Sequence, residues 1–262
     1  MSLHTIRAST LHLVRRAAVA LFVAGLVAGV SAHDIAVFPL TGPDGVRLRV
    51  RYGHPGDYQD TVAGKLVTLE TWAPDGQRRS AAGRLRDDGL ALITSPLGDL
   101  SPQGTWLVSA FYDNGFFLRT DDGRQVNTTR AEYPVAKTAT HNIKFGKALF
   151  AVGAPGAGFD RVVGHRLEFV PRQNPLTLAS GGTLDVELRF DGKPLAGATV
   201  FAYPEKESDP PAEVKTDASG VARVPVNRSG LFILGAEHGA PSRHPEMATR
   251  DAYAATLVFT VR

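Results

Sequence analysis

Residues 183–192 read TLDVELRFDG, and this stretch decides the fold class. Apolar residues at positions 184, 186, 188 and 190 alternate with polar ones, which is the period of a β-strand that buries one face. The Asp191-Gly192 pair that follows is a dipeptide typical of tight turns between strands. Beyond residue 32, no window of the sequence keeps a helical period for long. The sequence therefore predicts an all-β protein.

Similar stretches occupy the rest of the chain after residue 32, and turn motifs separate them. The strand-like stretches are residues 46–52, 66–72, 105–111, 141–145, 167–171, 198–203, 230–234 and 254–261. The turn motifs are Pro-Asp-Gly at 43–45 and 74–76, Asp-Asp-Gly at 87–89 and 121–123, and Asp-Asn-Gly at 113–115. Short strands with turns at this spacing are typical of antiparallel sandwiches and barrels. We therefore expect each motif, the one at 113–115 included, to form a turn.

A glycine-rich stretch divides the sequence. Residues 151–158 read AVGAPGAG, which is the composition of a linker or a long surface loop. We therefore expect two β-sandwich domains, at residues 33–150 and 165–262, joined by a linker at residues 151–164. The C-terminal half holds about seven short strands in about a hundred residues, which matches an immunoglobulin-like or transthyretin-like sandwich.

The first 32 residues have the pattern of a secretory signal peptide. Arg15 and Arg16 precede an apolar stretch of 14 residues, Ala17 to Val30, and small residues follow up to Ala32. The stretch is shorter than the ~20 apolar residues that span a bilayer. We therefore expect cleavage after Ala32, a mature chain that begins at His33, a periplasmic or secreted location, and no membrane insertion after cleavage.

Composition excludes several classes of site. The 262-residue chain has no cysteine, which removes thiol nucleophiles, disulfides and cysteine-ligated zinc. The formal net charge is +3, but Arg7, Arg15 and Arg16 lie in the predicted signal peptide, which has no acidic residue. The predicted mature chain is thus formally neutral, and no nucleic-acid partner is expected. Phosphate-binding loops, nucleophile elbows and dinucleotide motifs do not occur, so we expect a binding protein and not an enzyme.

Several stretches resemble one bacterial family. They are His33-Asp34, Tyr52-Gly53-His54-Pro55, YDNGFF at 112–117, LEFVP at 167–171, Asn174-Pro175, DGKPLAGA at 191–198 and TDASG at 216–220. Over most of residues 33–262 the chain resembles the NikM-like family of secreted proteins, formerly a domain of unknown function. The last two stretches are also common in transthyretin-like and carboxypeptidase-regulatory-like modules. The resemblance implies periplasmic handling of nickel or cobalt, associated with a metal-uptake transporter in the membrane.

The histidines are the candidate metal ligands, and His33 is chemically unusual among them. At the first position of a mature chain, His33 offers both its α-amine and its imidazole to one metal ion. A second imidazole completes a brace suited to Cu(II) or Ni(II). His54 lies between Gly53 and Pro55, a rigid turn that would fix the direction of its imidazole, and the NikM-like resemblance implies that it is a ligand and not an exposed turn histidine. The alternative is that cleavage merely happens to leave a histidine first.

The other candidate ligands depend on the fold. His141 and His238, expected at strand ends, would reach the same site only if the two halves bring them together. Asp57 and Asp60 lie close to His54 in sequence and can act as ligands or as acceptors that orient a ligand histidine. Histidines at strand ends and in turns are otherwise ordinary surface residues.

Three functions remain open on the sequence. The leading hypothesis is a periplasmic protein that binds a divalent transition metal, nickel, cobalt or copper, for uptake or buffering. The second is an envelope interaction or glycan-binding module without a metal. The third is a copper-dependent oxidase that uses a brace at His33. Convergence of His33, His54, His141 and His238 favours the first or the third.

Overall fold

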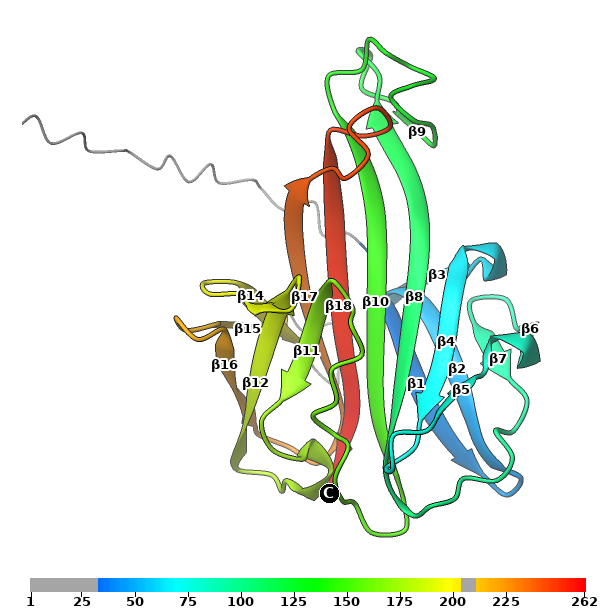
Figure 1. Ribbon diagram of the computed structural model, residues 1–262, viewed down its shortest axis with the longest axis vertical. Helices are drawn as coiled ribbons and strands as arrows, with labels where there is room; N and C mark the ends of the chain where they lie inside the picture. Colours follow the sequence, from blue (N-terminus) through cyan, green and yellow to red (C-terminus); the bar gives the residue numbers. More distant parts are fainter. Residues whose placement is uncertain (1–32, 204–210) are drawn as a thin grey trace, which may run out of the picture. The chain divides into compact units, whose positions relative to one another are not determined.

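The computed structural model describes residues 33–203 and 211–262, which belong to one compact unit (Figure 1). The predicted signal peptide, residues 1–32, lies outside the described residues. Within them the chain forms eighteen strands in three sheets and no α-helix, which confirms the all-β prediction. The short 3₁₀ turns are η1 (Ala63–Lys65), η2 (Ala82–Arg84) and η3 (Pro175–Thr177). No helix of the described chain is long and apolar enough to cross a membrane.

The N-terminal sheet carries the first residues of the predicted mature chain. It consists of β1 (Ile35–Gly42), β2 (Gly45–His54), β3 (Asp57–Gln59), β6 (Leu85–Asp87) and β7 (Leu92–Thr94), in the order β1-β2-β7-β6 with β3 beside β2. In β2, positions 46, 48 and 50 are buried and positions 47, 49 and 51 are half-buried. This alternation gives the sheet an inner apolar face and an outer face with arginines.

The central sheet is the largest, and strands from both halves of the chain form it. Its order is β15-β14-β17-β18-β10-β8-β4-β5, with β9 beside β8. The strands are β4 (Leu66–Trp72), β5 (Arg78–Ser80), β8 (Gly104–Arg119), β9 (Gln125–Val126), β10 (Ala139–Val152), β14 (Thr199–Tyr203), β15 (Ala212–Lys215), β17 (Gly230–Pro241) and β18 (Arg250–Val261). The third, C-terminal sheet contains β11 (Leu167–Pro171), β12 (Gly182–Phe190), β13 (Lys193–Pro194) and β16 (Val221–Val226).

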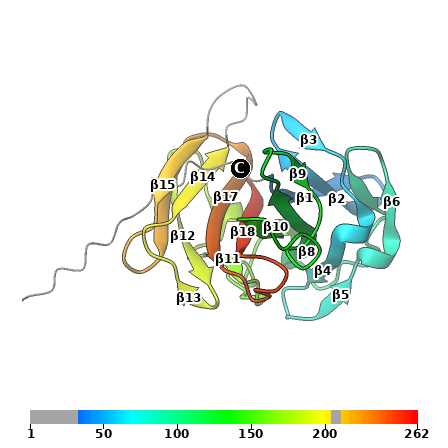
Figure 2. The same cartoon turned by 90° about the horizontal axis from the view of Figure 1, so that it is seen from above.

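The two smaller sheets pack on opposite faces of the central sheet (Figure 2). Along β8, Trp106 and Val108 belong to the core under the N-terminal sheet, whereas Leu107 between them belongs to the core under the C-terminal sheet. On β10, Ala148 belongs to the core under the N-terminal sheet and Leu149 to the core under the C-terminal sheet. Because side chains alternate across a strand, the central sheet contributes one face to each core.

The predicted division into two domains is not confirmed. β10 and β18 pair in parallel from Thr140–Arg250 to Ala148–Val258, so one continuous sheet joins strands from both sides of residues 151–164. The predicted linker begins inside β10, which extends to Val152.

The prediction of a turn at residues 113–115 is wrong. β8 runs through them, and Asn142 faces Gly115 while Ile143 faces Asp113, which leaves Asn114 as the extra residue of a β-bulge. Gly115 has φ +81, a conformation that favours glycine in a bulge as it does in a turn. The Asp-Asn-Gly sequence is compatible with a turn and with a bulge. A bulge forms here because β10 pairs with β8 on both sides of Asn114.

Candidate metal site at the start of the mature chain

The β1–β2 hairpin places His33 beside His54. The two strands pair from Ile35–Tyr52 to Gly42–Gly45, and the Gly53 N–H donates to the Asp34 carbonyl at 2.9 Å. This bond continues the pairing to the residues before β1. The imidazole centroids of His33 and His54 are 5.4 Å apart. The structure therefore brings together the two histidines that the sequence favoured most.

A tight turn after His54 adds a carboxylate to the pair. β2 and β3 pair through His54–Asp57 and Gly53–Tyr58, and Gly53 has φ +122. A Cβ at Gly53 would lie 2.3 Å from the Asp57 carbonyl oxygen, so this turn requires glycine. Asp57 Oδ2 lies 3.3 Å from His33 Nε2. Asp57 therefore contacts the histidine pair, as predicted for it or Asp60.

The contacts of His33 distinguish its two nitrogens. Nε2 lies 3.3 Å from both Asp57 Oδ2 and Gln59 Nε2, and the ring stands edge-on to Tyr52. The Asp57 carboxylate accepts only from a protonated Nε2, whereas the Gln59 amide nitrogen would donate to a bare one. A metal on Nδ1 selects the first arrangement, because the proton must then stay on Nε2. With a metal on Nδ1, the ring nitrogen nearer the backbone of His33, Nε2 would donate to Asp57.

His54 is oriented through its other nitrogen. Its Nδ1 lies 3.1 Å from the Tyr203 hydroxyl oxygen, and that hydroxyl donates to Asp34 Oδ2 at 3.1 Å. Because the hydroxyl has one proton, Tyr203 accepts from a protonated Nδ1 of His54 while it donates to the Asp34 carboxylate. The lone pair of His54 is then on Nε2. Burial lowers the pKa of His54, with the neighbouring His33 acting in the same direction, which favours the neutral imidazole that a metal requires.

Two buried ionisable side chains, Asp34 and Lys144, lie close to the histidines. Asp34 is 4% exposed and Lys144 is 1% exposed. Burial raises the pKa of Asp34 to about 7, and the Lys144 ammonium opposes that rise. Asp34 Oδ1 and Lys144 Nζ have no hydrogen-bond partner among the described residues. Buried polar atoms without a partner are costly, so each calls for a compensating interaction, such as a water molecule or an ion.

A glycine on β17 makes room for this arrangement. A Cβ at Gly235 would lie 2.9 Å from Tyr203 Cε2 and 3.2 Å from Asp34 Oδ2. The first residues of β1 are held there as well, because Thr256 Oγ1 donates to the Ile35 carbonyl at 2.6 Å. Tyr203, Gly235 and Thr256 come from the C-terminal half of the chain. The site is therefore completed by residues that the sequence analysis did not single out.

His141 and His238 do not join the site. His141 faces Asp251 across β10–β18, and His238 faces Tyr253 across β17–β18. Tyr253 packs in the core under the C-terminal sheet, so these two histidines point to the face of the central sheet opposite the N-terminal sheet. The central sheet thus separates them from His33 and His54.

Both distant histidines have local partners instead. His141 Nε2 is 2.8 Å from Asp113 Oδ1, and its ring stacks on Phe116 with centroids 4.2 Å apart. The His238 ring packs against Phe190 at 4.3 Å. Within residues 33–203 and 211–262, no three or more His, Asp or Glu side chains have the spacing of a metal site.

Comparison with known proteins places the chain in a family. A family described as "Domain of unknown function (DUF4198)" matches residues 30–240, and the chain belongs to it. An uncharacterized protein of Haemophilus influenzae (strain ATCC 51907 / DSM 11121 / KW20 / Rd) is 24% identical over 170 residues, which cover 65% of this chain and 67% of that protein. Neither description states a function.

One solved structure also matches over most of the chain. It is a tetra-tandem repeat in the extending region of a large adhesion protein, 12% identical, with a TM-score of 0.23 over 87% of this chain. The chain spans about half of that protein's length, 49%.

Proposed function

We propose that this protein binds a divalent transition metal through His33 and His54 once the signal peptide has been removed. The observation that carries the proposal is the orientation of the two imidazoles. They lie 5.4 Å apart, His33 Nε2 contacts Asp57 and His54 Nδ1 contacts Tyr203, and a brace would use the other nitrogen of each ring. A metal–nitrogen bond is about 2 Å long, so rings at this separation are compatible with one shared ion.

The proposed donors are the α-amine and Nδ1 of His33 and Nε2 of His54. The amine and Nδ1 of one residue close a chelate ring on the metal, and cleavage after Ala32 creates the amine. This accounts for a site with only two histidine side chains. Three nitrogen donors suit Cu(II) or Ni(II), while the NikM-like resemblance favours nickel or cobalt.

The surroundings supply what a bound cation needs. Asp57 accepts from the far nitrogen of His33, and Asp34 acts on His54 through the Tyr203 hydroxyl. Carboxylates in such positions fix the ligand tautomer and raise its basicity. Because burial raises the pKa of Asp34 to about 7, a cation bound nearby would favour its ionised form, and Asp34 Oδ1 has no hydrogen-bond partner among the described residues.

The proposal includes a cellular role. The apolar stretch before His33 supports export to the periplasm, where the protein would buffer a metal or pass it to an uptake transporter. The NikM-like relationship and the transthyretin-like character of the C-terminal half belong to the same proposal. Intact-mass analysis of protein recovered from the periplasm tests the first step, and the expected mass is that of residues 33–262.

Calorimetric titration of Ni(II), Co(II) and Cu(II) tests the site. The proteins compared are the chain beginning at His33, the same chain with one extra residue before it, and His54→Ala. His244→Ala is the matched control, because His244 is exposed and pairs only with Glu246 at 3.6 Å. Loss of the amine chelate or of His54 should weaken binding at least tenfold, about 1.4 kcal/mol.

Each outcome separates one part of the proposal. Equal affinity with the extra residue would exclude the α-amine and leave a side-chain site. Equal affinity in His54→Ala would move the site elsewhere. If none of the three metals binds, an envelope interaction module without a metal becomes the better explanation.

A further inference from the structure

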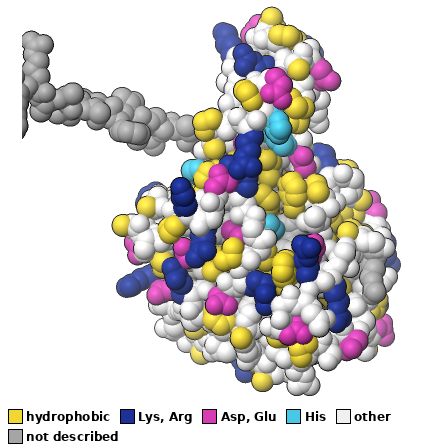
Figure 3. Space-filling model, viewed as in Figure 1, with side chains coloured by type: hydrophobic (Ala, Val, Ile, Leu, Met, Phe, Trp, Pro, Cys, Tyr) yellow, Lys and Arg dark blue, Asp and Glu magenta, His cyan; other side chains and the backbone are white. Residues whose placement is uncertain are grey.

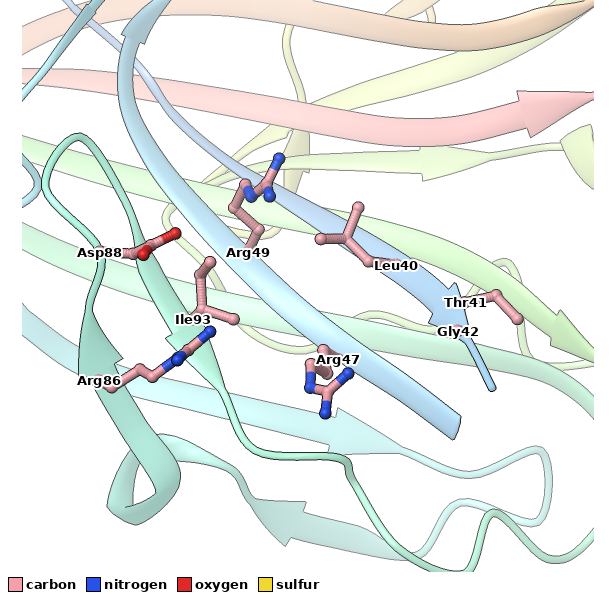
Figure 4. Close-up of a pocket in the computed structure, with 8 residues that line it drawn as sticks. All are labelled: Leu40, Thr41, Gly42, Arg47, Arg49, Arg86, Asp88 and Ile93. Atoms are coloured by element: carbon pink, nitrogen blue, oxygen red, sulfur yellow. The ribbon is translucent and has the colours of Figure 1, made fainter. Parts of the chain in front are cut away.

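Three arginines surround a pocket on the outer face of the N-terminal sheet (Figure 4). The pocket has a volume of about 450 Å³. Arg47 and Arg49 reach it from β2 and Arg86 from β6, and their side chains lie around Ile93 of β7. Leu40 adds a second apolar side chain. The pocket thus combines guanidinium groups with an apolar floor.

Strand register fixes how the arginines are spaced. Arg49 faces Ile93 across β2–β7, and Ile93 faces Arg86 across β7–β6. Residues in such a row point to the same face of a sheet, and neighbouring strands are about 4.8 Å apart. Arg49 and Arg86 are therefore roughly 10 Å apart at their Cα atoms. Arg47, two residues before Arg49, lies on the same face about 7 Å away.

These charges are poorly compensated by the protein. Arg47 contacts the exposed Asp44 at 3.3 Å. The side chains of Arg49 and Arg86 have no hydrogen bond or ion pair in the described part of the chain, and Asp88 is the one carboxylate that lines the pocket. Like charges gathered on one face of a sheet repel one another. An anion placed among them would relieve that repulsion.

The cluster is local and does not reflect the composition of the chain. Beyond residue 32 the sequence is formally neutral. On the face shown in Figure 3, basic and acidic side chains are intermingled. Around the pocket, three arginines stand against one lining acid. The excess positive charge is therefore a property of this site.

We infer that this pocket binds a small organic anion with two or more carboxylate groups. Guanidinium groups match carboxylates through paired N–H···O bonds, and arginines about 7 to 10 Å apart suit separate carboxylates on one molecule. Ile93 and Leu40 provide contact for the carbon skeleton, which inorganic phosphate and sulfate lack. The residues that line this pocket include neither His33 nor His54, and Arg49 and His54 lie on opposite faces of β2. Arg49 also lines a second pocket together with Tyr203.

Titration of metal-free protein with citrate tests this inference, with acetate and inorganic phosphate as comparison ligands. The variant is Arg49→Gln with Arg86→Gln. The matched control is Arg124→Gln with Arg223→Gln, which removes the same charge from two exposed sites that do not line the pocket. We expect citrate to bind more tightly than acetate or phosphate, and the pocket variant to lose at least tenfold in affinity while the control stays within twofold.

Three results would overturn the inference. An equal loss in both double variants, or phosphate bound as tightly as citrate, would mean general charge attraction. The third is no binding of citrate at millimolar concentration. The substituted arginines are on the surface, and the urea unfolding midpoint of each variant checks that it is folded. Because the titration uses no metal, its result does not depend on the proposed metal site.

Discussion

At the scale of single residues, the Tyr203 hydroxyl determines which nitrogen of His54 carries the proton. It donates to Asp34 and accepts from His54, and these residues come from three strands or their flanks. Tyr203 is 149 residues from His54 in the sequence. The sequence therefore gave no indication of this contact. His33, in contrast, could be recognised from the sequence because it directly follows the predicted cleavage site.

Tyr203→Phe tests this role. The ring still stacks on His54, but the hydroxyl that orients the imidazole is gone. We expect metal affinity to fall ten- to a hundredfold, the usual cost of removing a partner of a ligand histidine. The measurement is metal titration of the chain that begins at His33. Tyr133→Phe is the control, and unchanged affinity in Tyr203→Phe would show that Tyr203 does not orient a ligand.

His165 contributes to the pH dependence of stability. It stacks on Phe145 at 4.7 Å, and burial lowers its pKa to about 3. Between that value and the ordinary 6.5, the unfolded chain binds a proton that the folded chain excludes. The stability due to neutral His165 is therefore present above pH 6.5 and is lost as pH falls toward 3.

The corresponding variant is His165→Phe, which keeps an aromatic ring and removes the titration. Its free energy of unfolding should fall less steeply than that of the native chain between pH 6.5 and 4, by up to about 1.4 kcal/mol per pH unit. Urea unfolding at several pH values measures the two slopes. Parallel slopes would mean that His165 titrates alike in both states.

At the scale of elements, the turn between β2 and β3 holds His54 and Asp57 together. Gly53→Ala would place a Cβ against the Asp57 carbonyl at a φ that disfavours alanine. We expect a loss of at least about 2 kcal/mol in unfolding free energy, with weaker metal binding because the turn must move. Gly64→Ala is the control, since a Cβ there has nothing within 4 Å. Equal stability of the two variants would contradict this account of the turn.

The alternation of apolar and polar residues predicted where strands lie but not which strands pair with each other. The predicted stretches 66–72 and 167–171 coincide with β4 and β11, because each has its own apolar pattern and flanking turns. The strand predicted at residues 141–145 is only part of the longer β10, and the structure has a bulge in β8 where a turn was predicted at residues 113–115. Both differences arise from pairing between long strands, which depends on contacts that a local pattern does not contain.

At the scale of the whole molecule, a buried ion pair secures the junction of the two halves. Lys147 Nζ on β10 is 2.5 Å from Glu168 Oε1 on β11, and both side chains are 2% exposed. Lys147 also donates to the Arg161 carbonyl, and Glu168 accepts from the Val163 and Gly164 amides. The end of the predicted linker is thus held by a network of buried hydrogen bonds, which favours one fixed arrangement.

The shared sheet and this junction predict that residues 33–262 unfold in one step. The β10–β18 pairing and the Lys147–Glu168 network would both have to break before either half could unfold alone, and breaking a buried ion pair costs about 3 to 5 kcal/mol. In urea, the fluorescence of Trp106, followed in a Trp72→Phe variant because Trp72 packs against the core under the C-terminal sheet, reports the N-terminal half, and hydrogen exchange of β12 and β16 amides reports the C-terminal half. We expect coincident transitions and equal calorimetric and van't Hoff enthalpies. Two separated transitions would instead support the independent domains that the glycine-rich stretch suggested.

Lys147→Met leaves Glu168 buried without its cation, so it should lower the common unfolding midpoint. If the variant instead unfolds in two transitions, this ion pair is the element that couples the two halves.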